Sequence, residues 1–180
     1  MKKLIFAALI TLMIAGCNQA EKKSDTSVQK DNSTTGNGDE MKATYEANLA
    51  AYKSQIAAFE KEDINTWAAT IADNAVWHSP AYGDTGTSKA HWVESIKNIM
   101  DNNSNLHLTD AQFLPGVDSA TQKPDGSVRY YGTWHASPTG GKEVSIKFYG
   151  TYDFNSDHKI ISGDEYYDVG GLRNAVTPKK

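Results

Sequence analysis

Residues 130–168 read YYGTWHASPTGGKEVSIKFYGTYDFNSDHKIISGDEYYD, and apolar residues alternate with polar ones through much of this stretch. A period of two is typical of β-strands that bury one face. Two short runs rich in Gly, Pro, Asn and Asp interrupt the alternation and predict turns. We therefore predict three antiparallel strands and two connecting turns, with the strands at 128–136, 144–149 and 160–169 and the turns at 138–141 and 155–158.

A further strand is expected just before these three, at 106–117. Its alternation changes phase near Thr109 and Asp110, which predicts a β-bulge at that point. The sequence Pro-Asp-Gly at 124–126 is typical of a turn and is expected to connect this strand to the next.

Upstream of the strands, the apolar period changes to that of α-helices. A first helix is indicated by five apolar residues at spacings of four and three, which share one stripe: Tyr45, Leu49, Tyr52, Ile56 and Phe59. Asp63 is expected to cap a second, short helix that contains Ile64, Trp67, Ala68 and Ile71. After it, residues 75–78 are expected to be extended up to Pro80.

A third helix is expected after a glycine-bearing loop at 81–86, with Thr87 or Ser88 as its cap. Its apolar stripe consists of Trp92, Ile96, Ile99 and Met100. Helices followed by antiparallel strands predict an α+β fold in which the helices cover one face of the sheet.

The N-terminus has the organisation of a secretory signal at residues 1–16. Lys2 and Lys3 precede an apolar run at 4–14 that is too short to span roughly 30 Å of hydrocarbon. The run ends in Ile-Ala-Gly-Cys at 14–17, which resembles the bacterial lipobox. This resemblance implies that Cys17 receives a diacylglyceryl group, that the signal is removed, and that the new amino group is acylated with a fatty acid such as palmitate.

The alternative for this cysteine is plain secretion with a free thiol at Cys17. Because Cys17 is the only cysteine in the chain, its lipidation would leave no thiol for a disulfide, a metal site or a nucleophile. Lipidation would also attach the protein to a membrane of the cell envelope. Asn18 is not the aspartate typical of inner-membrane retention, which favours the outer membrane if the organism is Gram-negative.

Residues 17–40 are predicted to be a disordered tether, and residues 41–180 a single domain. Residues 18–40 contain no aromatic residue and only one Val, so this segment cannot bury enough apolar surface to fold. As a flexible coil it would span on the order of 25–30 Å. The formal net charge is −4, and no run of Lys or Arg interleaves with aromatic residues, so nucleic acid is not expected as a partner.

Two stretches resemble the NTF2-like superfamily, in particular its SnoaL-like branch. They are EKEDINTWAATIADNAVWHSP at 60–80 and the stretch at 130–168 quoted above. The resemblance implies a cone of three N-terminal helices packed into a curved antiparallel sheet, with a pocket between them, and a dimer formed through the outer sheet face. Two departures are Asp157-His158 in the last turn and Asp164-Glu165 in the last strand, so no catalytic set carries over.

Enzymes of this superfamily use an aspartate base, or a His–Asp pair, opposite a hydrogen-bond donor in an apolar cone. On this basis the candidate catalytic residues are Asp164 and His78. Trp77 and His78 are neighbours on one strand, so only one of them faces the interior, and the pattern leaves open which one. His135 faces outward if Tyr130 and Trp134 line the cone.

The chain has four Trp and nine Tyr, and all of them lie in the predicted domain. Rings with a polar edge suit the lining of a ligand pocket, although each of them also suits a plain core. The predicted ligand pocket comprises Trp77, His78, Tyr82, Trp92, Tyr130, Trp134 and Tyr166.

Three functions are compatible with these patterns. The first is a lipid-anchored, non-catalytic domain that binds a small hydrophobic or aromatic molecule. The second is an enzyme of the isomerase, dehydratase or cyclase type, and the third is a protein-interaction module with a filled cone. The five histidines show no metal-ligand spacing, and no nucleotide-binding or nucleophile-elbow motif is present, so neither a metal nor a cofactor is expected.

Overall fold

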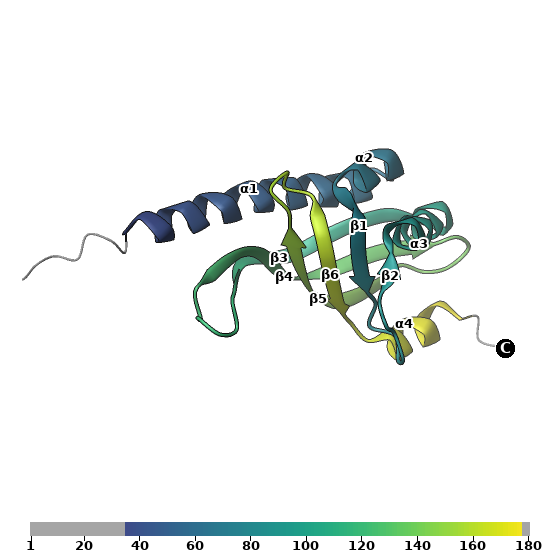
Figure 1. Cartoon of the computed structure of the whole chain (residues 1–180). Helices are drawn as coiled ribbons and strands as arrows, with labels where there is room; N and C mark the ends of the chain where they lie inside the picture. The colour runs from purple at the N-terminus through teal and green to yellow at the C-terminus, as the bar shows by residue number, and fades with distance from the viewer. Residues whose placement is uncertain (1–34, 178–180) are drawn as a thin grey trace, which may run out of the picture. The chain divides into compact units, whose positions relative to one another are not determined.

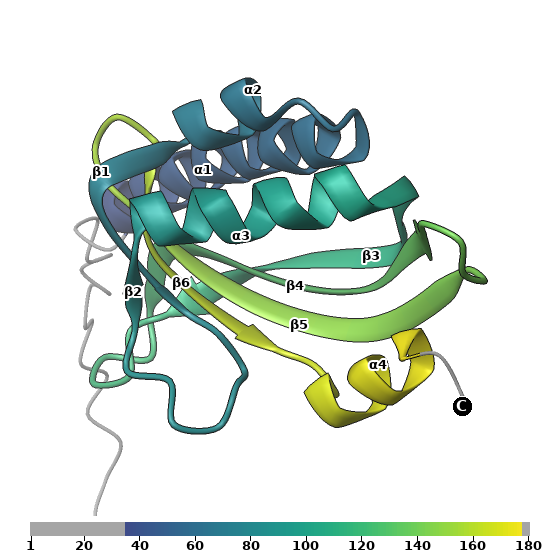
Figure 2. The ribbon, with the colours of Figure 1, turned by 90° about the vertical axis from the view of Figure 1, so that its right-hand side faces the viewer.

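A computed structural model describes residues 35–177 (Figure 1). Three helices, α1 (Thr35–Glu60), α2 (Ile64–Ala69) and α3 (Lys89–Asn102), lie over one face of a strongly curved sheet, as Figure 2 shows. The α+β class predicted from the order of the patterns is therefore confirmed.

The sheet has six strands in the order β2-β1-β6-β5-β4-β3. All neighbouring strands are antiparallel except β1 and β6, which run parallel. The strands are β1 (Ile71–His78), β2 (Thr87–Ser88), β3 (Asn103–Val117), β4 (Pro124–Pro138), β5 (Val144–Phe154) and β6 (Ile160–Tyr166).

Several local predictions are confirmed. The Asp63 carboxylate accepts a hydrogen bond from the backbone N–H of Thr66 and caps α2. The pairing of β3 with β4 shifts register between Thr109 and Gln112, where the change of phase predicted a bulge. Pro138–Gly141 forms the turn between β4 and β5, closed by a 2.9 Å hydrogen bond from Gly141 N to Pro138 O.

Three element boundaries differ from the prediction. Helix α1 begins at Thr35 rather than near residue 41, because a helix that is anchored by packing further along extends at little cost. The turn between β3 and β4 lies at 118–123, where the Asp118 carboxylate accepts from Thr121 N at 2.7 Å. Residues 124–126 are instead the first residues of β4.

The last predicted strand is also shorter than expected. It ends at Tyr166, and the chain then forms a fourth helix, α4 (Val169–Val176), which the sequence patterns did not predict. Asp168 caps this helix by accepting from Gly171 N at 2.8 Å. Figure 2 shows α4 near the ends of β5 and β6, away from the other three helices.

The core lies between the three first helices and the concave face of the sheet. Trp92, Tyr130 and Tyr152 are its largest fully buried side chains. Two glycines make room for these rings: a Cβ on Gly163 would lie 2.9 Å from Trp92 Cη2, and a Cβ on Gly150 would lie 2.7 Å from Tyr152 Cε2. Both distances are below van der Waals contact, so larger residues are excluded at these two positions.

The predicted signal at 1–16, Cys17 and most of the predicted tether lie outside the described residues. Across residues 35–177, no helix combines the length and the apolar composition that crossing a membrane requires.

Candidate functional site

A cavity of about 430 Å³ opens between the helices and the concave face of the sheet. Ligand sites in proteins measure roughly 300–1,000 Å³, so this cavity is of the right size for a small organic molecule. Its wall is mainly aromatic and aliphatic and is built by α1, α2, α3, β3, β4, β5, β6 and α4. The unpredicted helix α4 contributes Leu172 and Val176 to it.

Three tyrosines meet in this wall, one each from α1, β4 and β5. The ring centroids of Tyr52 lie 5.4 Å from Tyr130 and 4.4 Å from Tyr152. Burial raises the pKa of all three phenols, so they stay protonated near neutral pH. The indole N–H of Trp134 donates to the Tyr130 hydroxyl at 2.8 Å, which anchors that hydroxyl group.

One carboxyl group, that of Glu165, lies in the same wall. The Tyr152 hydroxyl donates to Glu165 Oε1 at 3.1 Å. Burial raises the pKa of Glu165 from 4.5 to about 7, while Tyr152 and the indole N–H of Trp77 act in the opposite direction. The Trp77 N–H is buried but its geometry falls short of a hydrogen bond. Glu165 therefore gains or loses a proton near neutral pH. A general acid or base needs this property, and so does a carboxylate that pairs with a charged ligand only above a certain pH.

Glu165 was not among the predicted site residues, and the candidate predicted on this strand was its neighbour Asp164. The pairing of β5 with β6 shifts register between Asp153 and Phe154, where Ile160 and Ser162 are the partners. This irregularity puts both Ile160 and Gly163 in the buried core. Strict alternation from Ile160 assigns the wrong face to every later residue of the strand.

Three of the predicted pocket residues line the cavity: Trp92, Tyr130 and Trp134. Trp77 is the inward-facing member of the Trp77–His78 pair, and its ring stacks on Trp92 with centroids 5.8 Å apart. Trp77 therefore packs against a residue of the cavity wall, Trp92, but does not line the cavity itself.

The other predicted pocket residues lie outside the main cavity. Tyr82 is fully exposed in the loop before β2. Tyr166 is 53 % exposed and stacks on Tyr149, whose ring in turn stacks on Tyr131. His78 and Asp164 line a separate, polar hollow of about 410 Å³ that shares Glu165 and Tyr167 with the main cavity. In that hollow His78 Nδ1 lies 3.7 Å from the Asp84 carboxylate.

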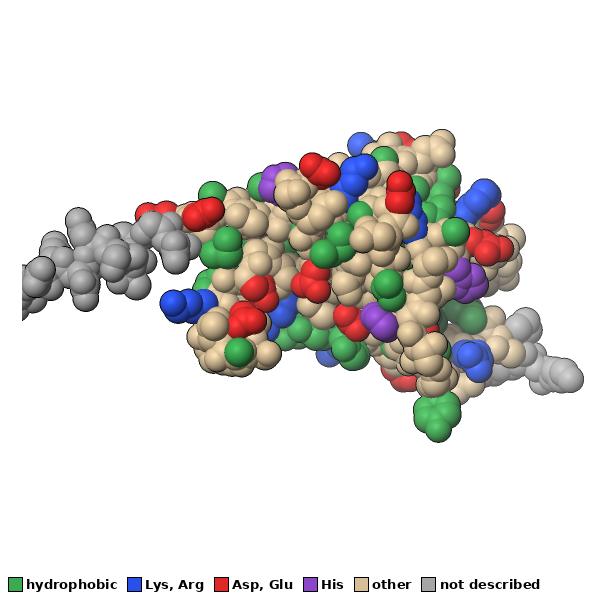
Figure 3. Space-filling model, viewed as in Figure 1, with side chains coloured by type: hydrophobic (Ala, Val, Ile, Leu, Met, Phe, Trp, Pro, Cys, Tyr) green, Lys and Arg blue, Asp and Glu red, His purple; other side chains and the backbone are tan. Residues whose placement is uncertain are grey.

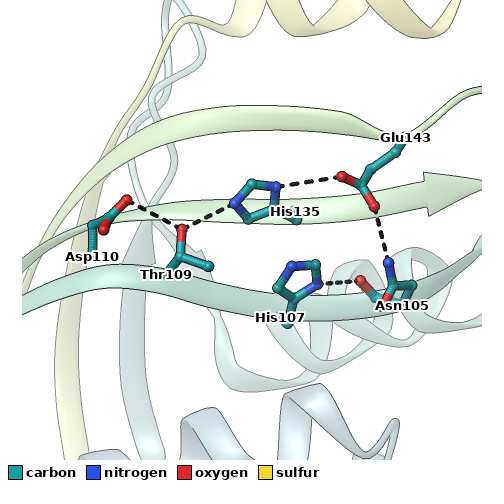
Figure 4. A network of polar contacts seen from close by, with 6 residues as sticks. All are labelled: Asn105, His107, Thr109, Asp110, His135 and Glu143. Carbon is teal, nitrogen blue, oxygen red and sulfur yellow. Dashed lines mark hydrogen bonds and ion pairs between the residues drawn. The ribbon is translucent and has the colours of Figure 1, made fainter.

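The ring of His135 belongs to a polar network that joins β3, β4 and the following turn (Figure 4). Its Nε2 lies 3.0 Å from Thr109 Oγ1, its Nδ1 lies 3.7 Å from Glu143, and the ring stacks on His107 at 4.5 Å. Although His135 contributes to the rim of the cavity, both ring nitrogens face this network. His135 is therefore not placed to act on a molecule inside the cavity.

No cluster of three or more His, Cys, Asp or Glu that could hold a metal occurs among residues 35–177. On the face seen in Figure 3, acidic and basic side chains are intermingled, and neither sign of charge gathers in one region. The main cavity is therefore the site on which a functional proposal can be built.

Comparison with known proteins agrees with this architecture. The family model described as a SnoaL-like domain matches residues 52–163. A second model, described as a prokaryotic membrane lipoprotein lipid attachment site, matches residues 1–18. No curated protein matches the chain significantly in sequence.

Solved structures share the fold at low sequence identity. An NTF2-like protein of unknown function from Burkholderia pseudomallei is 15 % identical, with a TM-score of 0.58, over 73 % of this chain and 98 % of that one. A putative polyketide cyclase from Xanthomonas campestris is 14 % identical, with a TM-score of 0.59, over 74 % and 99 %. An epoxide hydrolase from M. tuberculosis is 16 % identical, with a TM-score of 0.54, over 73 % and 90 %.

Proposed function

The chain belongs to the SnoaL-like domain family. We propose that its domain is anchored at a membrane of the cell envelope and binds a small, largely apolar organic molecule in the cavity between its helices and its sheet. The observation that carries this proposal is the cavity of about 430 Å³, with its mainly aromatic and aliphatic wall. A fold can host many activities, so the proposal rests on this site rather than on family membership.

The lipid attachment motif at residues 1–18 supports an anchor on Cys17. Two acyl-chain signals attach a protein stably to a membrane, whereas one does so only marginally. Asn18 favours the outer membrane as the finer location in a Gram-negative host. A cavity of this size also argues against an interaction module with a filled cone.

Filling the cavity tests the proposal. Ala136 is partly buried and lines the cavity from β4, so a Trp at this position occupies ligand space without replacing a core residue. We expect Ala136→Trp to weaken binding of the neutral dye N-phenyl-1-naphthylamine by at least about tenfold, or ~1.4 kcal/mol. Fluorescence titration of the processed chain, with Cys17→Ser to remove the lipid, measures this effect.

Ala120→Trp is the matched control, because Ala120 is exposed in the turn between β3 and β4. This variant is expected to bind the dye as the wild type does, and both variants should keep the wild-type unfolding midpoint in urea to within a small shift. Equal dye binding by wild type and Ala136→Trp would contradict the proposed binding site.

A second candidate function is acid–base catalysis by Glu165, since its carboxyl lies 3.1 Å from the Tyr152 hydroxyl inside an apolar cavity. A carboxylate whose pKa is about 7 can take up a proton from carbon in such a cavity. In this reading Glu165 takes the role that the sequence assigned to Asp164 or His78.

This candidate predicts exchange of the α-protons of an enolisable ketone with solvent. With 2-tetralone in D2O, ¹H NMR should show exchange in wild type that rises with pH through about 7 and falls by ~10²–10⁴-fold in Glu165→Gln. Exchange that is equal in wild type and Glu165→Gln would rule out Glu165 as the base and leave the non-catalytic function.

A homodimer through the outer sheet face also remains an expectation of the fold. The exposed ring of Tyr131 and the exposed ring of Tyr166 lie on either side of Tyr149 on that face. Such a surface of amphipathic rings is compatible with a partner subunit.

A further inference from the structure

We propose that the ligand of the main cavity is an apolar organic cation, an amine bearing hydrophobic substituents, whose charge is paired by Glu165 and surrounded by the aromatic wall. This inference rests on the proposed binding function and names the chemical class of the ligand. The inference follows from the charged residues of the cavity wall, from its aromatic rings and from the position of its single carboxylate.

Among the described residues, the cavity wall contains one acidic residue, Glu165, and neither Lys nor Arg. Its one histidine, His135, directs both ring nitrogens to the network of Thr109 and Glu143. Within residues 35–177 no Lys, Arg or His lies within salt-bridge distance of Glu165. Glu165 is partly buried, and a carboxylate withdrawn from water without a counter-ion is destabilised, so a cationic ligand relieves that cost and an anionic one increases it.

The groups that face Glu165 are donors that stabilise its charged form. Tyr152 of β5 donates to it directly, and the indole N–H of Trp77 on β1 lies near it. The other titratable groups that interact with it are Tyr52, Tyr130 and Tyr167, whose pKa values are raised. The polar hollow on the other side of Glu165 adds His78, Asp84 and Asp164.

The remaining wall suits the apolar body of such a cation. Nine of the wall residues are aromatic, and the faces of Trp, Tyr and Phe rings attract cations. The rings of Trp67 and Trp92 meet edge to face at 5.4 Å, and that of Phe59 meets Trp134 in the same way at 5.0 Å. Perpendicular pairs of this kind give a cavity with ring faces on several sides, as a bound quaternary ammonium group requires.

A pair of ligands with equal shape tests the role of charge. Benzyltrimethylammonium carries a permanent positive charge, and neopentylbenzene is its uncharged isostere. A purely apolar cavity prefers the isostere, because the cation loses more hydration on entering it. We therefore titrate both compounds into the processed chain with Cys17→Ser and follow tryptophan fluorescence at pH 6 and pH 8.

We expect the wild type to bind the cation more tightly than the isostere at pH 8, and its affinity for the cation to rise about tenfold from pH 6 to pH 8. The rise reflects ionisation of Glu165 with a pKa of about 7. In Glu165→Gln the affinity for the cation should be at least about tenfold lower at pH 8 and should not change with pH.

Asp164→Asn is the matched control, because it removes the neighbouring carboxylate, which lines only the polar hollow. Its affinity for the cation should equal that of the wild type. Urea unfolding of each variant checks that the fold is retained.

Four results would overturn the inference. Tighter binding of the isostere at both pH values would reject the cationic ligand class while leaving the binding cavity in place. An unchanged pH dependence in Glu165→Gln, or an equal loss in Asp164→Asn, would reject the pairing with Glu165. If neither compound binds while N-phenyl-1-naphthylamine does, the cationic ligand class fails and the binding cavity stands; if the dye does not bind either, the proposed binding function fails as well.

Discussion

Replacing Trp92 with Ala is expected to lower the free energy of unfolding by about 3–5 kcal/mol, the usual loss for a fully buried aromatic side chain. Trp92 is 1 % exposed. Its ring packs against Trp67 of α2, Trp77 of β1 and Tyr152 of β5, with centroids 5.4, 5.8 and 6.5 Å away. Trp92 thus joins two helices to both halves of the sheet, and no single neighbour can move to fill the space it leaves.

The measurement is urea unfolding followed by far-UV circular dichroism, which does not depend on tryptophan fluorescence. Tyr82→Ala is the control, since Tyr82 is fully exposed and its truncation should change stability by less than about 0.5 kcal/mol. A loss below ~1 kcal/mol for Trp92→Ala would mean that this ring is not the centre of the core packing.

Replacing Glu165 with Gln is expected to stabilise the domain at pH 8 relative to the wild type, because it removes a partly buried carboxylate whose pKa is raised on folding. Below pH 4.5 the carboxyl is protonated in both the folded and the unfolded chain, so its pKa shift does not affect stability. Between pH 4.5 and about 7 the unfolded chain ionises first, so rising pH favours unfolding. A pKa shift of this size corresponds to a loss of up to ~3 kcal/mol in the free energy of unfolding above pH 7, and to a smaller loss where water reaches the carboxyl.

Urea unfolding of wild type and Glu165→Gln at pH 5 and pH 8 measures this loss. The wild type should lose stability relative to the variant between these two pH values. Asp63 and Asp73 have lowered pKa values and titrate below this window, and Asp153, whose pKa is raised, is unchanged in both proteins. A variant that is equally or less stable than the wild type at pH 8 would contradict the raised pKa.

This expected stabilisation matters for function. A group that destabilises the empty fold at neutral pH is retained at a site where it serves a ligand or a reaction. The same substitution is expected to raise stability and to weaken cation binding, and a residue with a purely structural role would not combine these two effects.

Local patterns identified most of the elements of this fold. The apolar stripe of the first helix, the Asp63 cap and the change of phase near Thr109 each depend on residues close together in the chain. Helix α4 was missed because it is short, contains two glycines and has no buried residue. Its apolar residues Val169, Leu172 and Val176 recur at helical spacing, but a stripe of three positions is too short to identify a helix by itself.

The site was predicted less completely than the fold. Trp92, Tyr130 and Trp134 were predicted to line a pocket and do line the cavity, because helix stripes and strand alternation identify which residues share a face. Alternation does not identify which of the two faces meets the helices once a strand contains an irregularity. On β6, which has a register shift near Ile160, Glu165 rather than Asp164 lies in the cavity wall, and Tyr166 falls on the outer face.

The sequence by itself determined the α+β class, the SnoaL-like resemblance and the lipid attachment motif at Cys17, because each of these depends on residue order and local spacing. Only the tertiary structure decided that Glu165 carries the charge of the cavity. That outcome depends on a register shift in β6 and on the hydroxyl of Tyr152, a residue of another strand. It also depends on burial in the folded domain, which raises the pKa of this glutamate to about 7.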